Sequence, residues 1–70
     1  MKVIKITASA DQLAKFTPLA REVCEDLAGM IYQAEELGAD VPTRSRRFKV
    51  NDNVYGPMII TDHYCKVIVE

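Results

Sequence analysis

The sequence predicts a single α+β domain over residues 1–70, in which one long helix packs on a small antiparallel sheet. The helix is indicated by apolar residues in alternating steps of three and four, which fall on one helical face. This apolar run consists of Leu13, Phe16, Ala20, Val23, Leu27, Met30, Ala34 and Leu37. The sheet is indicated by β-branched segments on both sides of the run. The expected order is β-α-β-β(-β), with three or four strands.

The limits of the expected helix follow from capping residues. Ser9 and Gln12 have the spacing of a capping box, and Gly38 is suited to the position just after a helix. Pro18 lies inside the run, where proline removes a hydrogen bond and clashes with the preceding turn. Two interpretations remain: a short helix ends near Phe16 and a second begins with Thr17 as its cap, or one helix continues with a kink.

The flanking segments predict strands by composition and alternation. In the first of them, Ile4 and Ile6 are expected to face the helix. Gly56 and Pro57 indicate a bulge or an edge position. A connector at 39–42 and a turn at 51–53 separate the later elements. The expected strands are residues 2–7, 43–50, 54–61 and 64–69.

The size of the chain favours self-association. A domain of 70 residues buries a small share of its surface and is only marginally stable without further contacts. One helix covers one face of a sheet, so apolar residues such as Val3 and Ile68 would remain on the other face. The apolar run is itself wide enough to suit packing on a sheet better than a coiled-coil seam. We therefore expect a homo-oligomer, most simply a dimer.

Cysteine usage and hydropathy indicate a cytoplasmic protein. Cys24 and Cys65 are the two cysteines, too few for a secreted disulfide scaffold, and we expect both to be free thiols in the core. The first residues lack the apolar stretch of a signal peptide, and no segment has the length of a membrane span. The expected surroundings are a reducing cytoplasm without membrane contact.

A basic segment is the first candidate binding site, formed by Arg44, Arg46, Arg47 and Lys49. If Phe48 and Val50 pack inward, Arg47 and Lys49 point outward. Three interpretations are open: charges that keep an edge strand from pairing, a patch for an acidic protein, or a patch for nucleic-acid phosphate. In the last case Tyr55 or Tyr64 would stack on bases. The net charge of −1 disfavours nucleic acid, since its binding domains are usually basic.

An acidic helix face is the second candidate, formed by Glu22, Glu25, Asp26, Glu35 and Glu36. Residues 10–40 carry seven acidic and two basic side chains, a net charge of −5, whereas residues 41–70 have a net charge of +2. Such an acidic face is either a solvated surface or a docking surface for a basic protein.

Catalysis, metals and cofactors are not expected. His63, Cys65, Cys24 and Asp62 do not have the paired spacing of a structural zinc site. A Cys–His catalytic pair would also need a cleft and an oxyanion hole, for which a chain with three glycines has little room. The sequence also lacks glycine-rich phosphate and dinucleotide motifs.

The composition and size together predict a non-catalytic protein-interaction module. We expect it to bind another protein of unknown identity and to self-associate, as a small regulator or inhibitor such as those encoded by viruses or mobile elements. The alternative is a small nucleic-acid-binding protein that uses the basic segment at 44–49.

Overall fold

The computed structural model describes residues 1–39 and 44–70. The expected connector at 39–42 and the start of the expected strand at 43–50 therefore fall largely outside the described residues. Within them the chain forms five strands and two helices of seven residues each. In chain order these are β1 (Lys2–Ile6), α1 (Ala10–Phe16), α2 (Arg21–Leu27), β2 (Ile31–Leu37), β3 (Arg47–Asp52), β4 (Gly56–Thr61) and β5 (Cys65–Val69).

The prediction of one long helix is wrong at Pro18. The capping box is present, since Ser9 and Gln12 each accept a hydrogen bond from the other's backbone N–H. The helix ends at Phe16 because Thr17, which precedes a proline, is extended rather than helical. The Thr17 N–H and hydroxyl both donate to the carbonyl of Leu13. The interpretation with a break near Phe16 is the correct one, although the second helix begins at Arg21 instead of Pro18.

The prediction is wrong again after Gly29, where the chain turns into a strand. Gly29 has a φ of +82°, a conformation that helical residues do not adopt and that glycine adopts without strain. Tyr32 and Ala34 are then buried while Gln33 is exposed, the alternation of a strand. Of the eight residues in the apolar run, three are buried: Leu13, Leu27 and Ala34.

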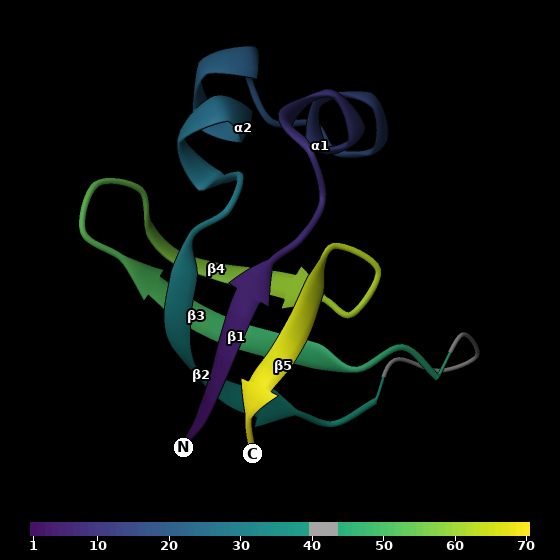
Figure 1. Cartoon of the computed structure of the whole chain (residues 1–70), viewed down its shortest axis with the longest axis vertical. Coiled ribbons are helices and arrows are strands. Elements are labelled where there is room, and N and C mark those ends of the chain that lie inside the picture. The colour runs from purple at the N-terminus through teal and green to yellow at the C-terminus, as the bar shows by residue number, and fades with distance from the viewer. Residues whose placement is uncertain (40–43) are drawn as a thin grey trace.

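The five strands form one antiparallel sheet in the order β4-β3-β2-β1-β5. Residues 31–34 of β2 pair with β1, whereas residues 35–37 pair with β3. β2 is therefore shared by two halves of the sheet. The sheet coils so strongly that β3 and β4 pass behind β1, β2 and β5, as Figure 1 shows.

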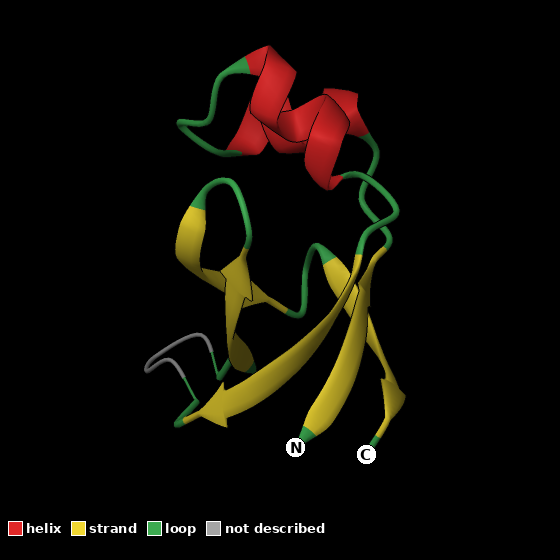
Figure 2. Ribbon diagram, turned by 90° about the vertical axis from the view of Figure 1, so that its left-hand side faces the viewer, coloured by secondary structure: helices red, strands yellow, loops and turns green. Residues whose placement is uncertain are grey.

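The helical pair lies at one end of the coiled sheet, and both chain termini lie at the other (Figure 2). Ile4 and Ile6 face the interior as predicted, with 0% and 2% of their surface exposed. The core consists of Ile4, Ile6, Ala8, Leu13, Cys24, Leu27, Tyr32, Ala34, Phe48, Val50, Ile60 and Cys65. Among the described residues, no helix has both the length and the apolar character needed to cross a membrane.

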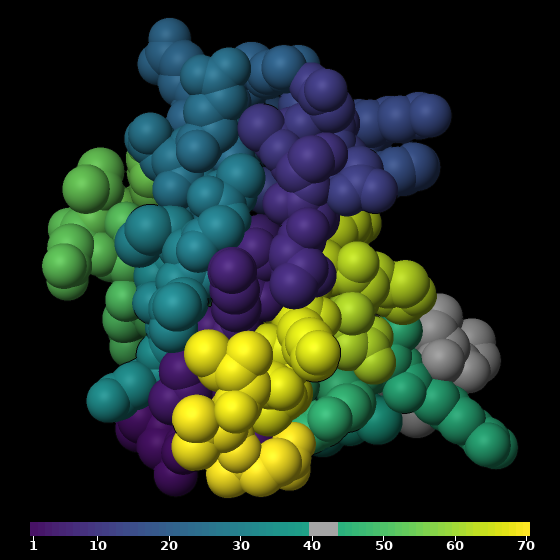
Figure 3. Space-filling view, in the orientation of Figure 1, coloured from purple at the N-terminus to yellow at the C-terminus, as the bar shows by residue number. Residues whose placement is uncertain are grey.

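The β3–β4 hairpin is shaped by Asp52 and Gly56. The Asp52 carboxylate accepts hydrogen bonds from the backbone N–H groups of Val54 (2.7 Å) and Tyr55 (3.0 Å), which fixes the turn. Gly56 then takes a φ of +78° and returns the chain to β4. The hairpin tip projects at the side of the molecule next to α2 (Figure 3).

Candidate protein-interaction groove

The structure separates the four residues of the basic segment. Phe48 and Val50 are buried, so Arg47 and Lys49 of β3 point outward as the alternation predicts. Arg47 donates to the carbonyl of Gly38 at 2.8 Å, and Lys49 lies opposite Glu35 in the sheet register. Arg44 precedes β3 and is exposed, with a φ of +59°.

Arg46 belongs to an ion cluster that also contains Lys2, Glu36 and Glu70. Its guanidinium forms a two-bond contact with Glu36, at 2.9 Å through Nε and 2.8 Å through Nη2, and lies 3.2 Å from Glu70. Lys2 contacts Glu36 as well. The guanidinium also lies 5.2 Å from the centre of the Phe48 ring, a cation–π distance. The cluster links the start of β1 to the ends of β2 and β5 and to the residue before β3. The Arg46 guanidinium is therefore engaged in contacts within the fold.

The ion cluster makes stability depend on acid. Hydrogen bonds from Arg46, and next from Lys2, lower the pKa of Glu36 from 4.5 to about 2. A carboxylate with a lowered pKa stabilises the folded state above its ordinary pKa, and this contribution is lost as pH falls through the folded value. The contribution of Glu36 should therefore be complete at neutral pH and disappear between pH 4.5 and about 2.

We expect Glu36→Gln to lower the unfolding temperature near neutral pH and to converge with the wild type near pH 2. Thermal unfolding followed by circular dichroism across this range measures the difference. Glu35→Gln removes the same charge from the adjacent residue of β2, whose side chain lies on the opposite face, and should follow the wild-type curve. A Glu36→Gln deficit that is equally large at both ends of the range would exclude this role for the ion cluster.

The five residues of the expected acidic helix face are divided between a helix and a strand. Glu22, Glu25 and Asp26 lie on α2, whereas Glu35 and Glu36 lie on β2 because the second half of the expected helix is a strand. Arg21 of α2 pairs with Glu25 at 3.3 Å and also contacts Asp11 of α1. The Tyr55 hydroxyl donates to the Asp26 carboxylate, and this contact joins the hairpin tip to α2. This hydrogen bond raises the pKa of Tyr55 to about 12.

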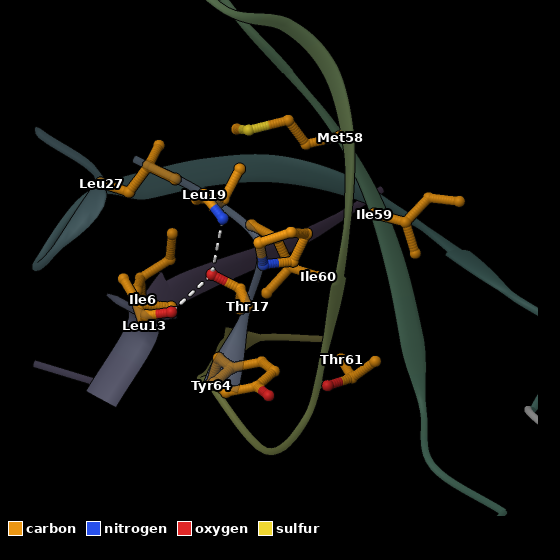
Figure 4. Close-up of a pocket in the computed structure, with 11 residues that line it drawn as sticks. Ile6, Leu13, Thr17, Leu19, Leu27, Met58, Ile59, Ile60, Thr61 and Tyr64 are labelled. Carbon is orange, nitrogen blue, oxygen red and sulfur yellow. Dashed lines mark hydrogen bonds between the residues drawn. The ribbon is translucent and has the colours of Figure 1, made fainter. Parts of the chain in front are cut away.

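A groove opens between the helical pair and β4. One wall is the connector at 17–20, whose Thr17, Pro18 and Leu19 line the groove across from β4 (Figure 4). The hydroxyl of Thr17 accepts a hydrogen bond from the Leu19 N–H at 3.4 Å, so the connector has a fixed turn. The apolar groove is lined by Ile6, Leu13, Thr17, Pro18, Leu19, Leu27, Met58, Ile59, Ile60, Thr61 and Tyr64.

The lining of the apolar groove carries no charged side chain, and its volume is about 320 Å³. Met58 and Ile60 point into it from β4, while Ile59 borders it and directs its side chain to the opposite side of the strand (Figure 4). Leu19 is 37% exposed at the groove, whereas Ile59 is 58% exposed on the opposite side of β4. Large apolar side chains left exposed around a concave apolar surface are typical of a binding site rather than of a closed core.

The surroundings of the groove are acidic on the side of the hairpin tip. Tyr55 lies directly before β4 and contacts Asp26, and the negative charge of Glu22 also acts on Tyr55. At the other end, Asp62 and His63 follow β4, with 3.7 Å between Asp62 Oδ1 and His63 Nδ1. A partner segment with basic residues at its ends would therefore meet complementary charge.

The described residues contain no cluster of histidine, cysteine, aspartate or glutamate with the arrangement of a metal site. Cys24 and Cys65 are both buried free thiols. Burial is the main cause that raises the pKa of the Cys65 thiol to about 11, which keeps it protonated at neutral pH.

The groove was missed in the sequence because its walls come from segments far apart in the chain. Two local signals point to it: the proline that interrupts the helices, and the absence of charge from Gly56–Thr61. Comparison with known proteins gives no match to any family model, curated protein or solved structure.

Proposed function

We propose that this chain is a non-catalytic protein-interaction module that receives an extended apolar segment of another protein along β4. The observation that carries the proposal is the apolar groove, with its uncharged lining and with Leu19 exposed at its rim. Side chains of a bound segment would enter the groove between Met58, Ile60 and the connector at 17–20.

An extended segment is favoured because β4 is an edge strand. Among the described residues, β4 pairs with β3 on one side and with no strand on the other. A free edge presents unpaired backbone N–H and C=O groups, and an added strand can satisfy them while alternate side chains fill neighbouring pockets. The groove and the edge belong to the same strand, so one segment can use both.

The proposal is tested with a defined peptide. The probe is a short synthetic peptide that alternates isoleucine and threonine and carries a lysine at each end, titrated into the ¹⁵N-labelled chain. We expect amide shifts along β4 and the connector at 17–20, with a Kd on the order of 100 μM, since a short segment loses conformational freedom on binding. A matched peptide with glycine in place of isoleucine should cause no such shifts.

Two variants locate the contact. Leu19→Lys places a charge at the rim of the groove and should abolish the peptide shifts. Ile68→Lys makes a similar change on β5, where the side chain is 46% exposed and outside the groove, and should leave binding unchanged. Shifts that map to the outer face of β1 and β5, or no shifts at millimolar peptide, would contradict the proposal.

A further inference from the structure

Within residues 1–39 and 44–70, the sheet ends in two edge strands, β4 and β5, which are unequally protected against pairing. On β5, Lys66 is charged, Glu70 directly follows the strand, and the register with β1 is irregular between Val3 and Ile4. Charges and irregularities of this kind prevent sheet edges from joining. β4 has no charged residue over Gly56–Thr61, and the residues after Pro57 have ordinary strand pairing with β3. β4 is therefore the edge that is open to a further strand.

We infer that two copies of this chain associate by antiparallel pairing of their β4 strands. The inference rests on the proposed function, because β4 of a second copy is itself an extended, uncharged segment of the kind that this edge receives. Self-pairing also brings no like charges together, since the strand has none. The result is a continuous ten-stranded sheet with a two-fold axis at its centre.

The symmetry of such a pair determines its register. Two residues directly opposite each other in an antiparallel pair point to the same face of the sheet, and residues of one strand that share a face are an even number of positions apart. The two-fold axis must therefore pass beside a residue that lies opposite the same residue of the other copy. Ile59 is the best centre because it is apolar and 58% exposed, and self-pairing would cover its side chain. Met58 then lies opposite Ile60 of the other copy.

This register also accounts for the groove and for Pro57. Met58 and Ile60 both point into the groove. When Met58 of each copy lies opposite Ile60 of the other, the two grooves join into one apolar surface, bordered by residues 17–20 of both copies. Pro57 would lie opposite Thr61 of the other copy, and because proline has no N–H the ladder ends there. The pairing therefore involves about three residues from each strand, the lower limit of ordinary strand lengths.

An interface of this size predicts a weak and reversible dimer. Stable dimers bury roughly 800 Å² on each partner, and short edge contacts bury less. Sedimentation equilibrium should therefore show a mass near 7.9 kDa at low micromolar concentration that rises toward twice this value at high concentration.

The decisive variant is Ile59→Lys, which would place two lysines opposite each other on the axis. We expect it to weaken dimerisation by at least roughly tenfold. Mixing it with Ile59→Glu should give a dimer stronger than that of Ile59→Lys alone, because the opposite residues then attract. Ile68→Lys changes an exposed isoleucine on β5 and should leave the dimer intact. Circular dichroism confirms that each variant is folded.

The outcomes distinguish this inference from the proposed function. A chain that stays monomeric at millimolar concentration, or a dimer that is lost in Ile68→Lys and kept in Ile59→Lys, overturns the inference. If the monomeric chain still binds the isoleucine–threonine peptide along β4, the proposed function stands without the dimer. If it binds neither the peptide nor itself, both fail.

Discussion

Replacing Phe48 by alanine is expected to remove a large share of the folding free energy of this domain. Phe48 has none of its surface exposed and is the largest fully buried side chain. Truncating a buried phenylalanine costs about 3–5 kcal/mol, through lost apolar transfer and the cavity that remains. Folded domains have about 0.05–0.15 kcal/mol of stability per residue, which gives roughly 4–10 kcal/mol here. The cation–π contact with Arg46 would be lost as well.

Phe16→Ala is the matched control, since it makes the same chemical change on a side chain that is 62% exposed. Its effect should stay within about 1 kcal/mol, as is usual for surface substitutions. Urea unfolding followed by circular dichroism measures both variants on one scale. A Phe48→Ala protein that unfolds at the same urea concentration as Phe16→Ala would mean that the core is not centred on β3.

The same pair of residues shows how far the sequence predicts the fold. Phe16 belongs to the apolar run with helical spacing, yet it is exposed because the helix ends there and Thr17 turns the chain away. The alternation of its segment places Phe48 and Val50 on one face and Arg47 and Lys49 on the other, and the structure shows that the face with Phe48 is the buried one. Alternation within one segment was therefore a sound guide, whereas a spacing pattern that crossed Pro18 and Gly29 was not.

The sequence predicts a helix where β2 lies because the apolar residues of this segment fit both the helical period and the alternation of a strand. Ala34 and Leu37 continue the steps of three and four, while Tyr32 and Ala34 also alternate as in a strand. A short segment of this kind is decided by its neighbours in the folded chain, where β2 pairs on both sides and links the two halves of the sheet. The prediction of one long helix is wrong for this reason, and the five acidic residues therefore divide between α2 and β2.

The candidate sites were predictable only as far as single strands allowed. The outward directions of Arg47 and Lys49 follow from alternation, but the pairing of Arg46 with Glu36 depends on β2 being a strand beside β3. The apolar groove depends on more distant contacts, since Leu19 and Met58 come from opposite halves of the chain. Binding of nucleic acid by the basic segment stays a prediction. Because Arg46 is paired with Glu36 and Glu70, such binding would depend mainly on Arg44, Arg47 and Lys49.

Gly56→Ala is expected to destabilise the domain by about 1–2 kcal/mol, because an L-residue in the left-handed region brings its Cβ close to the following carbonyl. Gly56 has a φ of +78°, and no atom outside residues 55–57 lies within 4 Å of the position that a Cβ would occupy, so the cost is conformational rather than steric crowding by the rest of the fold.

Gly38→Ala is the matched control, because Gly38 has equally open space and no positive φ. The alanine there should be neutral or stabilising by up to about 1 kcal/mol, through the lower entropy of the unfolded chain. Urea unfolding should therefore move the two variants in opposite directions or separate them by at least roughly 1 kcal/mol. Because Gly56 directly begins β4, the same strain should also reduce the order of the groove edge, and Gly56→Ala should bind the isoleucine–threonine peptide more weakly than Gly38→Ala. Equal stability of the two variants would show that the β3–β4 turn does not need the left-handed conformation at residue 56.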